Sequence, residues 1–269
     1  MKIIQLNCWN FRYFDEMLTF LKQEKPDIIN LQEVSFANPR IDPEGKHDYF
    51  EILKKELGMD GIFAPWQEVV LNSGIHYKFG NAFLTKLDIV DYGVFFEPNL
   101  DELKITNEAD ETFQAILQND KTKYHLFFKE AKNYIWATLK YKNQLIRNLT
   151  THYTASFECT EILQIIDQTK SVINFLDNVK PLPTIFTGDL NIHDKSYSIS
   201  LLKDKLDLVN PGLVNTLNPE IHPLFKNKPD NKGLAVDYIF STGFTTKSCA
   251  CPVIAISDHL PVIAELELS

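Results

Sequence analysis

The 269-residue chain lacks any long hydrophobic run. No window approaches the ~18 to 20 unbroken apolar residues that a membrane-spanning helix requires, which argues against such a helix. The first residues, MKIIQLNCWNFRYF, do not resemble a signal peptide, because Gln5, Asn7 and Asn10 interrupt the apolar stretch and no small-residue cleavage site follows. We therefore interpret this segment as the first strand of the fold and expect a cytoplasmic protein.

The sequence also has few cysteines and few arginines. The four cysteines include no CxxC pair, and Cys249 with Cys251 alone is a poor zinc motif, so we expect scattered thiols in a reducing compartment. Only three arginines accompany 24 lysines, and the net charge is −9, so the average composition indicates no basic nucleic-acid footprint. This balance weakens the case for a tight binder of duplex DNA but not for an enzyme, because bound divalent cations can supply local positive charge.

The chain reads as a single α/β domain over residues 1–269, because no repeat, low-complexity tract or linker divides it. Strands alternate with helices early and hairpins appear later, which favours mixed sheets with helices outside. A polar, acidic, weakly periodic segment at about 98–130 is interpreted as an insertion with a short helix near 110–118. The other expected helices are at about 14–24, 46–57 and 158–178, and the expected strands are at 2–9, 27–34, 81–86, 133–141, 144–154, 183–191, 234–240 and 261–268.

Polar side chains of one chemical type lie at the ends of these strands. They are Asn7, Glu33, His152, Asp189 with Asn191, and Asp258 with His259, and Asp237 lies at the start of another strand. In extended backbone, residues i and i+2 point to the same side, so Asp189 and Asn191 should project together, with Gly188 allowing a bend before them. Asp258 and His259 are adjacent and need a bent loop, which Pro261 supplies.

Each of these motifs also has a purely structural interpretation. GDLN could be a turn with an Asx hydrogen bond, His152 a satisfied core histidine, and Asn7 a helix cap. A buried carboxylate, however, costs several kcal/mol unless it is paired or bound to metal. Gathering Glu33, Asp189, Asp237 and Asp258 at strand ends therefore needs a cation, and hard oxygen ligands favour Mg²⁺, or Mn²⁺, over zinc.

The ordered motifs resemble those of the endonuclease/exonuclease/phosphatase superfamily. They span residues 3–263 and read LNCWN, LQEV, TTHYTAS, GDLNIHDKS, VDYIF and SDHLPV. The superfamily includes deoxyribonuclease I, abasic-site endonucleases, neutral sphingomyelinases and inositol-polyphosphate 5-phosphatases. The resemblance implies a four-layer α/β sandwich, in which two mixed β-sheets face each other and helices lie outside.

The resemblance also implies roles for the motif residues. Asn7 and Glu33 would hold the metal, with Asp258 supporting the metal or the region of His259. Asp189 and Asn191 would orient the attacking water and bind phosphate oxygen. His259 would be the general base or a phosphate contact, and Asp237 would pair with its ring. His152 would contact the scissile phosphate or donate a proton to the leaving oxygen.

The segment around His152 is similar to that of the branches with a histidine there, namely deoxyribonuclease I, sphingomyelinases, 5-phosphatases and tyrosyl-DNA phosphodiesterase. Abasic-site endonucleases instead carry a tyrosine-containing segment at this place. The acidic partner of His152 is not evident, and Glu97 is one candidate. We expect a metal-dependent phosphodiesterase or nuclease that is a monomer. Nucleic acid is the favoured substrate, ahead of lipid or inositol phosphate. The alternatives are a lipid or inositol-phosphate phosphoesterase of the same fold and a non-catalytic binding protein, which the complete set of motifs disfavours.

Overall fold

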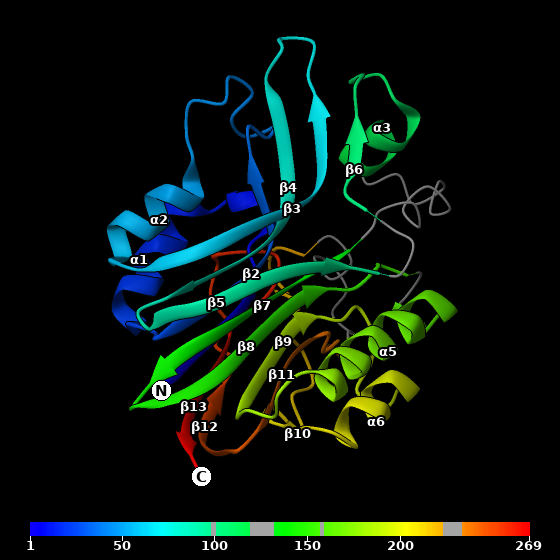
Figure 1. Ribbon diagram of the computed structural model, residues 1–269. Helices are drawn as coiled ribbons and strands as arrows, with labels where there is room; N and C mark the ends of the chain where they lie inside the picture. The colour runs from blue at the N-terminus through cyan, green and yellow to red at the C-terminus, as the bar shows by residue number, and fades with distance from the viewer. Residues whose placement is uncertain (98–100, 119–131, 157–158, 223–232) are drawn as a thin grey trace.

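Two mixed β-sheets form the centre of the computed structural model, which describes residues 1–97, 101–118, 132–156, 159–222 and 233–269 (Figure 1). The first sheet has the strand order β12 (Phe244–Ala250), β13 (Val262–Leu268), β1 (Lys2–Asn7), β2 (Ile28–Phe36), β4 (His76–Thr85), β3 (Asp60–Val70) and β6 (Leu103–Ile105). The second has the order β10 (Asp207–Leu208), β11 (Asp237–Thr242), β9 (Thr184–Asp189), β8 (Gln144–His152), β7 (Asn133–Tyr141) and β5 (Asp88–Phe96). Parallel pairs, β1 with β2 and β8 with β9, lie among antiparallel ones.

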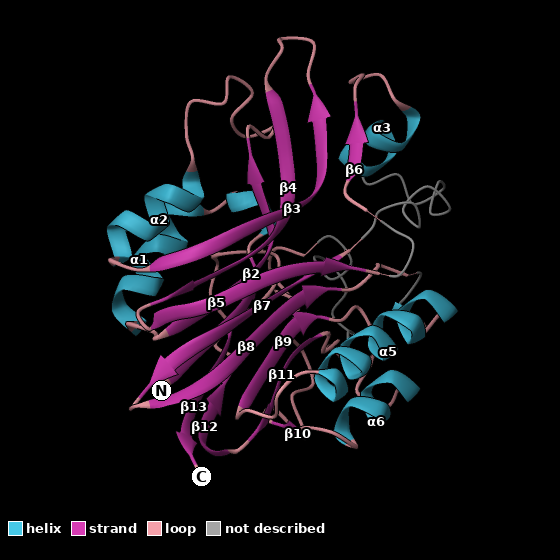
Figure 2. Ribbon diagram, in the orientation of Figure 1, coloured by secondary structure: helices cyan, strands magenta, loops and turns pink. Residues whose placement is uncertain are grey.

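Helices lie on the outer side of each sheet (Figure 2). The first sheet carries α1 (Phe14–Glu24) and α2 (Tyr49–Leu57), and the second carries α5 (Leu163–Asn178) and α6 (Tyr197–Lys203). A 3₁₀ turn (Trp9–Phe11) follows β1, and α3 (Glu111–Gln118) packs near β6. Helix, sheet, sheet and helix therefore form four layers, which confirms the predicted sandwich.

The two sheets share one apolar core between their facing surfaces. Side chains of both sheets meet there, among them Ile3, Ile28, Phe83, Ile135, Ile146, Ile185, Ile239 and Val262. Separate apolar clusters seal α1 and α2 against the first sheet and α5 and α6 against the second. Burial of these faces fixes the sheets against each other and so fixes the relative positions of their strand ends.

Several elements differ from the sequence-based expectation. Strands β3, β6, β10 and β12 were not predicted, and β4 begins at His76 instead of residue 81. The second helix begins at Tyr49, where Asp48 caps it by accepting a hydrogen bond from the Glu51 N–H (3.1 Å), and it ends at Gly58 as expected. The hairpin across Lys142 and Asn143 is confirmed, and both turn residues have positive φ, as a tight two-residue hairpin turn requires.

The long helix, expected at about 158–178, begins at Leu163, and residue 158 lies outside the described residues. The apolar periodicity of the sequence predicts a buried stripe of Ile162, Ile166, Thr169, Ile173 and Leu176, and the buried face of the helix is rotated from it. The fully buried positions are Ile165, Gln168, Thr169 and Val172. Residues 98–100 and 119–131 of the proposed insertion are likewise outside the described residues, whereas the helix expected near 110–118 is α3.

The segment YGVFFEP contributes to β5, which lies at the edge of the second sheet. Phe95 is packed against Tyr134 and Phe175, whereas Tyr92 and Val94 are exposed. The sequence allows two interpretations of this segment, an exposed aromatic patch and a core strand. The core strand, which the sequence favours, is met on one face only, and Pro98 lies outside the described residues. No helix within the described residues is both long enough and apolar enough to span a membrane.

Candidate active site

Strand register in the second sheet places three motif residues side by side. His152 is the last residue of β8 and lies opposite Asp189, the last residue of β9. Asp189 in turn lies opposite Asp237, the first residue of β11. A row of one imidazole and two carboxylates therefore crosses three adjacent strands at one end of the sheet, and all three residues are buried.

The first sheet brings Asn7 and Glu33 to the same place. Asn7 ends β1, and its Nδ2 donates to Oε1 of Glu33 (3.1 Å) and to Oδ2 of Asp189 (3.1 Å), so it links the two sheets. Glu33 was expected to end its strand, but β2 continues beyond it to Phe36. It lies at a β-bulge, where the register with β4 shifts between Leu31 and Val34 and φ of Glu33 is 56°. The bulge re-aims this side chain toward the site.

Asp258 and His259 lie in the bent loop before β13, as the sequence predicts. Ser257 anchors the loop: its Oγ donates to the carbonyl of Asn7 (2.6 Å) and accepts from the N–H of His259 (3.2 Å). Nδ1 of His259 lies 2.8 Å from Oδ2 of Asp237, and Nε2 lies 3.7 Å from Oδ2 of Asp189. The ring of His259 is thus held by one carboxylate and directed at another.

The GDLN segment is both an Asx turn and part of this cluster. β9 ends at Asp189, whose Oδ1 accepts from the N–H of Asn191 (3.1 Å), and Asn191 has φ of 51°. The two side chains converge on Nε2 of His152, with Asp189 Oδ2 at 3.4 Å and Asn191 Nδ2 at 3.0 Å. A turn, not the i, i+2 periodicity of a continuous strand, produces this alignment. Leu190 between them is fully buried, as expected.

Gly188 has a different role from the bend that the sequence suggested. A Cβ at this position would lie 2.6 Å from the carbonyl oxygen of Thr151 on β8. Glycine is therefore needed because the two strands approach closely just before Asp189.

His152 is enclosed by groups that differ from those expected. Its ring lies edge-on to Trp66, with centroids 5.6 Å apart, and its buried Nδ1 has no hydrogen-bond partner among the described residues. Glu97 does not pair with it. That carboxylate instead accepts hydrogen bonds from Gln168 and from Gln164 (3.4 Å) of α5.

The carboxylates of the site are short of positive charge. Burial raises the pKa of Asp189 to about 7, against a usual value of 3.8, and the charge of Asp237 adds to the rise. Burial likewise raises the pKa of Asp258 to about 7, with Glu33 contributing. The pKa of Glu33 is raised by burial and only partly offset by the hydrogen bond from Asn7. Three carboxyl groups therefore resist ionisation together in the metal-free protein.

The two histidines are shifted in opposite directions. Burial lowers the pKa of His152 well below its usual value, and the positive charges of Lys132 and His259 lower it further. For His259, burial opposes the charged form, but the charges of Asp237 and Asp189 outweigh it and raise its pKa well above the usual value. The surroundings thus favour the neutral imidazole at His152 and the imidazolium at His259.

The donor set fits a hard divalent cation. Glu33 and Asp258 carry carboxylate oxygens, a ligand type that Mg²⁺ and Mn²⁺ accept. Asn7 turns its amide nitrogen toward Glu33 and Asp189, and its amide oxygen, which accepts from the Trp9 N–H (3.1 Å), would face a cation only after the amide rotates. Burial and the charge of Asp189 raise the pKa of Glu33, and burial and the charges of Glu33 and Asp237 raise that of Asp258, so a bound cation would favour the ionised form of both. Asp189, Asp237 and His259 form a second group whose ligand atoms all lie within 4.8 Å of one another.

Several residues of the site were not identified from the sequence. Gln5 Nε2 donates to Oδ1 of Asp237 (3.3 Å) and to Gln32, which itself donates to Thr150 (3.1 Å). The signal for Gln5 was its i, i+2 spacing from Asn7, which places both on one face of β1. Trp66 lies on an unpredicted strand, and the others, Ser257 and Lys132, come from loops.

Two facing mixed sheets with this carboxylate–imidazole cluster at their strand ends define a deoxyribonuclease I-like α/β sandwich. The sequence matches the model of the Endonuclease/Exonuclease/phosphatase family over residues 4–259, and the chain belongs to that family. It matches none of the curated proteins with which it was compared.

Solved structures show the same fold at low sequence identity. An endonuclease/exonuclease/phosphatase from Bacteroides vulgatus is 19% identical, with a TM-score of 0.70, covering 100% of this chain and 98% of the other. A mannosyl-6-phosphatase from Bacteroides thetaiotaomicron is 16% identical, with a TM-score of 0.66 and full coverage of both chains. The catalytic domain of human Nocturnin is 17% identical, with a TM-score of 0.60, covering 100% of this chain and 94% of the other.

Proposed function

We propose that this protein is a phosphoester hydrolase that depends on a divalent cation, Mg²⁺ or Mn²⁺, and directs water at a phosphate. The observation that carries the proposal is the convergence of both sheets on Asp189, which contacts Asn7 of one sheet and His152 of the other and lies 3.7 Å from Nε2 of His259. Membership of a family that acts on phosphoester bonds supports the same reaction class.

The cation would be held by Asn7, Glu33 and Asp258. When bound, it would neutralise the buried carboxylates and polarise a phosphate oxygen. Asp189 and Asn191, linked by their Asx hydrogen bond, orient the attacking water.

The two histidines complete the proposed site. His259 directs Nε2 at the phosphate, which it contacts as an imidazolium, or it takes the proton of the water once a bound cation offsets the carboxylate charges that raise its pKa. Asp237 holds its ring for either role. His152 lies on the other side of Asp189, where it contacts the phosphate or serves the leaving oxygen.

For the substrate, we propose a phosphodiester in nucleic acid as the first candidate. A small phosphate monoester is the second, favoured by two observations. The net charge of −9 with only three arginines gives little attraction for a polyanion, and one structural neighbour is a mannosyl-6-phosphatase. We further propose a cytoplasmic monomer made of one domain.

A substrate panel with and without Mg²⁺ tests the proposal. It should contain plasmid DNA, single-stranded DNA, RNA, a 5′-tyrosyl oligonucleotide, sphingomyelin, an inositol polyphosphate and mannose 6-phosphate. Glu33→Gln is the negative control. Release of phosphate or cleaved product by the wild type alone supports the proposal, whereas no turnover on any substrate with Mg²⁺ or Mn²⁺ contradicts it.

Replacing His259 with alanine should reduce turnover by at least ~10²-fold, the scale of a lost acid–base group. Asp237→Asn should reproduce part of this loss, because the 2.8 Å contact to Nδ1 fixes the ring. The exposed His193 provides the control, and His193→Ala should keep full activity. Wild-type turnover by Asp237→Asn at every pH would show that the pairing is not used in catalysis.

Metal-free protein should lose stability as pH rises from about 6.5 to 8. Folded Asp189 and Asp258 hold protons up to about pH 7, whereas their usual pKa is 3.8, so the stability that they contribute is complete below pH 3.8, falls as pH rises from 3.8 towards 7, and loses its last part between 6.5 and 8. The raised pKa of His259 acts in the same direction above 6.5. The lowered pKa of His152 has the opposite sign, but it changes stability only below 6.5.

Added Mg²⁺ should reverse this loss. At a concentration of 100 times Kd it contributes about 2.7 kcal/mol, or roughly 5–10 °C in Tm, and the gain should be larger at pH 8 than at pH 6.5. Thermal unfolding of EDTA-treated protein at both pH values, with and without Mg²⁺, measures this. An equal shift at both pH values, or none, would contradict the expectation.

A further inference from the structure

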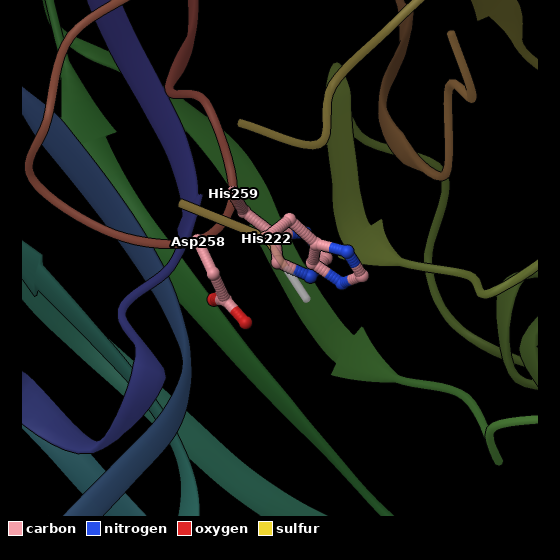
Figure 3. Close-up of side chains that lie close together, drawn as sticks. All are labelled: His222, Asp258 and His259. Atoms are coloured by element: carbon pink, nitrogen blue, oxygen red, sulfur yellow. The ribbon is translucent and has the colours of Figure 1, made fainter. Parts of the chain in front are cut away.

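A third imidazole, that of His222, lies beside the loop of residues 257–259 (the SDH loop) and outside the motifs that resemble the family. Ring nitrogens of His222 and His259 and a carboxylate oxygen of Asp258 all lie within 4.8 Å of one another. The two rings are edge-on, with centroids 5.9 Å apart. Figure 3 shows the three side chains directed into the same space, with His222 reaching it from a different segment of the chain.

The backbone around His222 is fixed to the SDH loop by hydrogen bonds. Asn218 N–H donates to the carbonyl of Asp258 (2.7 Å), and Asn218 Nδ2 donates to the carbonyl of Ser257 (3.1 Å). The N–H of His222 then donates back to the carbonyl of Asn218 (2.9 Å). A bridge between Leu217 and His259 adds to this connection. The position of His222 is therefore set relative to Asp258 and His259.

The donor set differs from that of the proposed magnesium site. Two imidazoles and one carboxylate are ligands that Zn²⁺ takes in four-coordinate sites with one open position, whereas Mg²⁺ prefers oxygen. Asp237 holds Nδ1 of His259 at 2.8 Å, which leaves Nε2 as the ligating nitrogen. Such a carboxylate behind an imidazole is the usual support of a zinc-bound histidine, because it fixes the tautomer and the ring orientation.

We propose that His222, Asp258 and His259 form a Zn²⁺-binding site that inhibits the enzyme. The inhibition rests on the proposed function: Zn²⁺ would occupy Asp258, needed for the catalytic cation, and Nε2 of His259, needed at the phosphate. His222 belongs only to the zinc site. Removing it therefore separates inhibition from catalysis.

Zinc binding is measured first, without substrate. EDTA-stripped protein is titrated calorimetrically with Zn²⁺ in a Cys249→Ser, Cys251→Ser background, so that thiols do not contribute. His222→Ala should weaken the tightest binding event at least ~10-fold, and the matched variant His193→Ala should leave it unchanged. His222→Gln, which keeps the side-chain length and a polar end, replaces the alanine variant if that variant does not fold. Equal zinc affinity with and without the imidazole would overturn the site.

Inhibition is measured second, at saturating Mg²⁺ on the substrate found by the panel. Zn²⁺ should inhibit the wild type and His193→Ala, and the concentration for half-inhibition should rise at least ~10-fold in His222→Ala, whose zinc-free turnover stays near wild type. Equal zinc sensitivity of all three would overturn the inhibitory role. Zinc binding that depends on His222, in a protein without turnover on any substrate, would keep the site and reject the proposed function instead.

Discussion

Replacing Glu33 with glutamine should lower cation-supported turnover by roughly 10²- to 10³-fold, the range seen when a group that stabilises transition-state charge is lost. Glutamine keeps the shape of the side chain and removes the charge that the cation would bind. The variant should also lose the rise in Tm that Mg²⁺ gives the wild type. Without metal it should be as stable as the wild type or more so, because burial already raises the pKa of Glu33 and disfavours its charged form.

Glu68→Gln provides the control for this substitution. Glu68 lies on β3 in the same sheet, partly buried, and contacts His76 and Lys78 near the surface, so its loss should change little. Full turnover by Glu33→Gln, or full turnover by EDTA-treated wild type, would remove Glu33 from the cation site. An equal loss in both variants would point to a general effect on folding.

Strand ends in the second sheet were predictable because local signals agreed there. His152 and Asp189 each follow a run of apolar or β-branched residues, and Asp237 precedes one, so the pattern places these residues near strand ends. The expected strands nevertheless run two residues past His152 and Asp189 and begin three residues before Asp237. Pairing of the strands then brings the three together, which requires only that β8, β9 and β11 be neighbours. The four-layer arrangement follows from the alternation of strands and helices together with the resemblance.

The position of Glu33 could not be predicted, because a bulge is a property of strand pairing. The segment reads as a strand that ends in polar residues, and only the pairing of β2 with β4 shows that it continues to Phe36 with one residue displaced. The positive φ of Glu33 belongs to that displacement and has no counterpart in the residue type. Sequence identified the residue but not the backbone that aims it.

The buried face of α5 was misjudged because polar residues occupy part of it. Gln168 is fully buried, and its Nε2 donates to Thr154 Oγ1 (2.9 Å) while its Oε1 accepts from the Thr154 N–H (3.1 Å). A glutamine with internal partners can replace an apolar residue in the core, whereas Ile166 and Ile173 remain partly exposed. Hydrophobic periodicity does not detect such a residue.

Sequence patterns also do not detect Gln5, which supports the site, or His222, which lies beside it. Gln5 contacts Asp237 across 232 positions of sequence, and His222 reaches His259 through a loop that Asn218 attaches to Ser257 and Asp258. These contacts depend on how the sheets pack and on loop conformation, which no local signal encodes. Motif residues were found because their types and order resemble a family.

Asp189→Asn and Asn191→Ala should each reduce turnover by roughly 10²- to 10³-fold, and the double variant should lose little more than the worse single one. The Asp189 side chain accepts from the backbone N–H of Asn191, and both side chains meet at Nε2 of His152, so removing either side chain should disorder the position of the attacking water. Groups that act as one unit are non-additive when they are replaced. Two independent contacts would instead give losses that multiply.

Thermal midpoints of the same three variants separate catalysis from folding. Asp189→Asn should leave the metal-free protein at least as stable, because the raised pKa of Asp189 shows that its charge is disfavoured there. Asn191→Ala should cost about 1–2 kcal/mol, since φ of 51° is strained for alanine and the hydrogen bonds to His152 and to the Tyr153 carbonyl are lost. Multiplying losses in turnover, or wild-type activity in either single variant, would show that GDLN is only a turn.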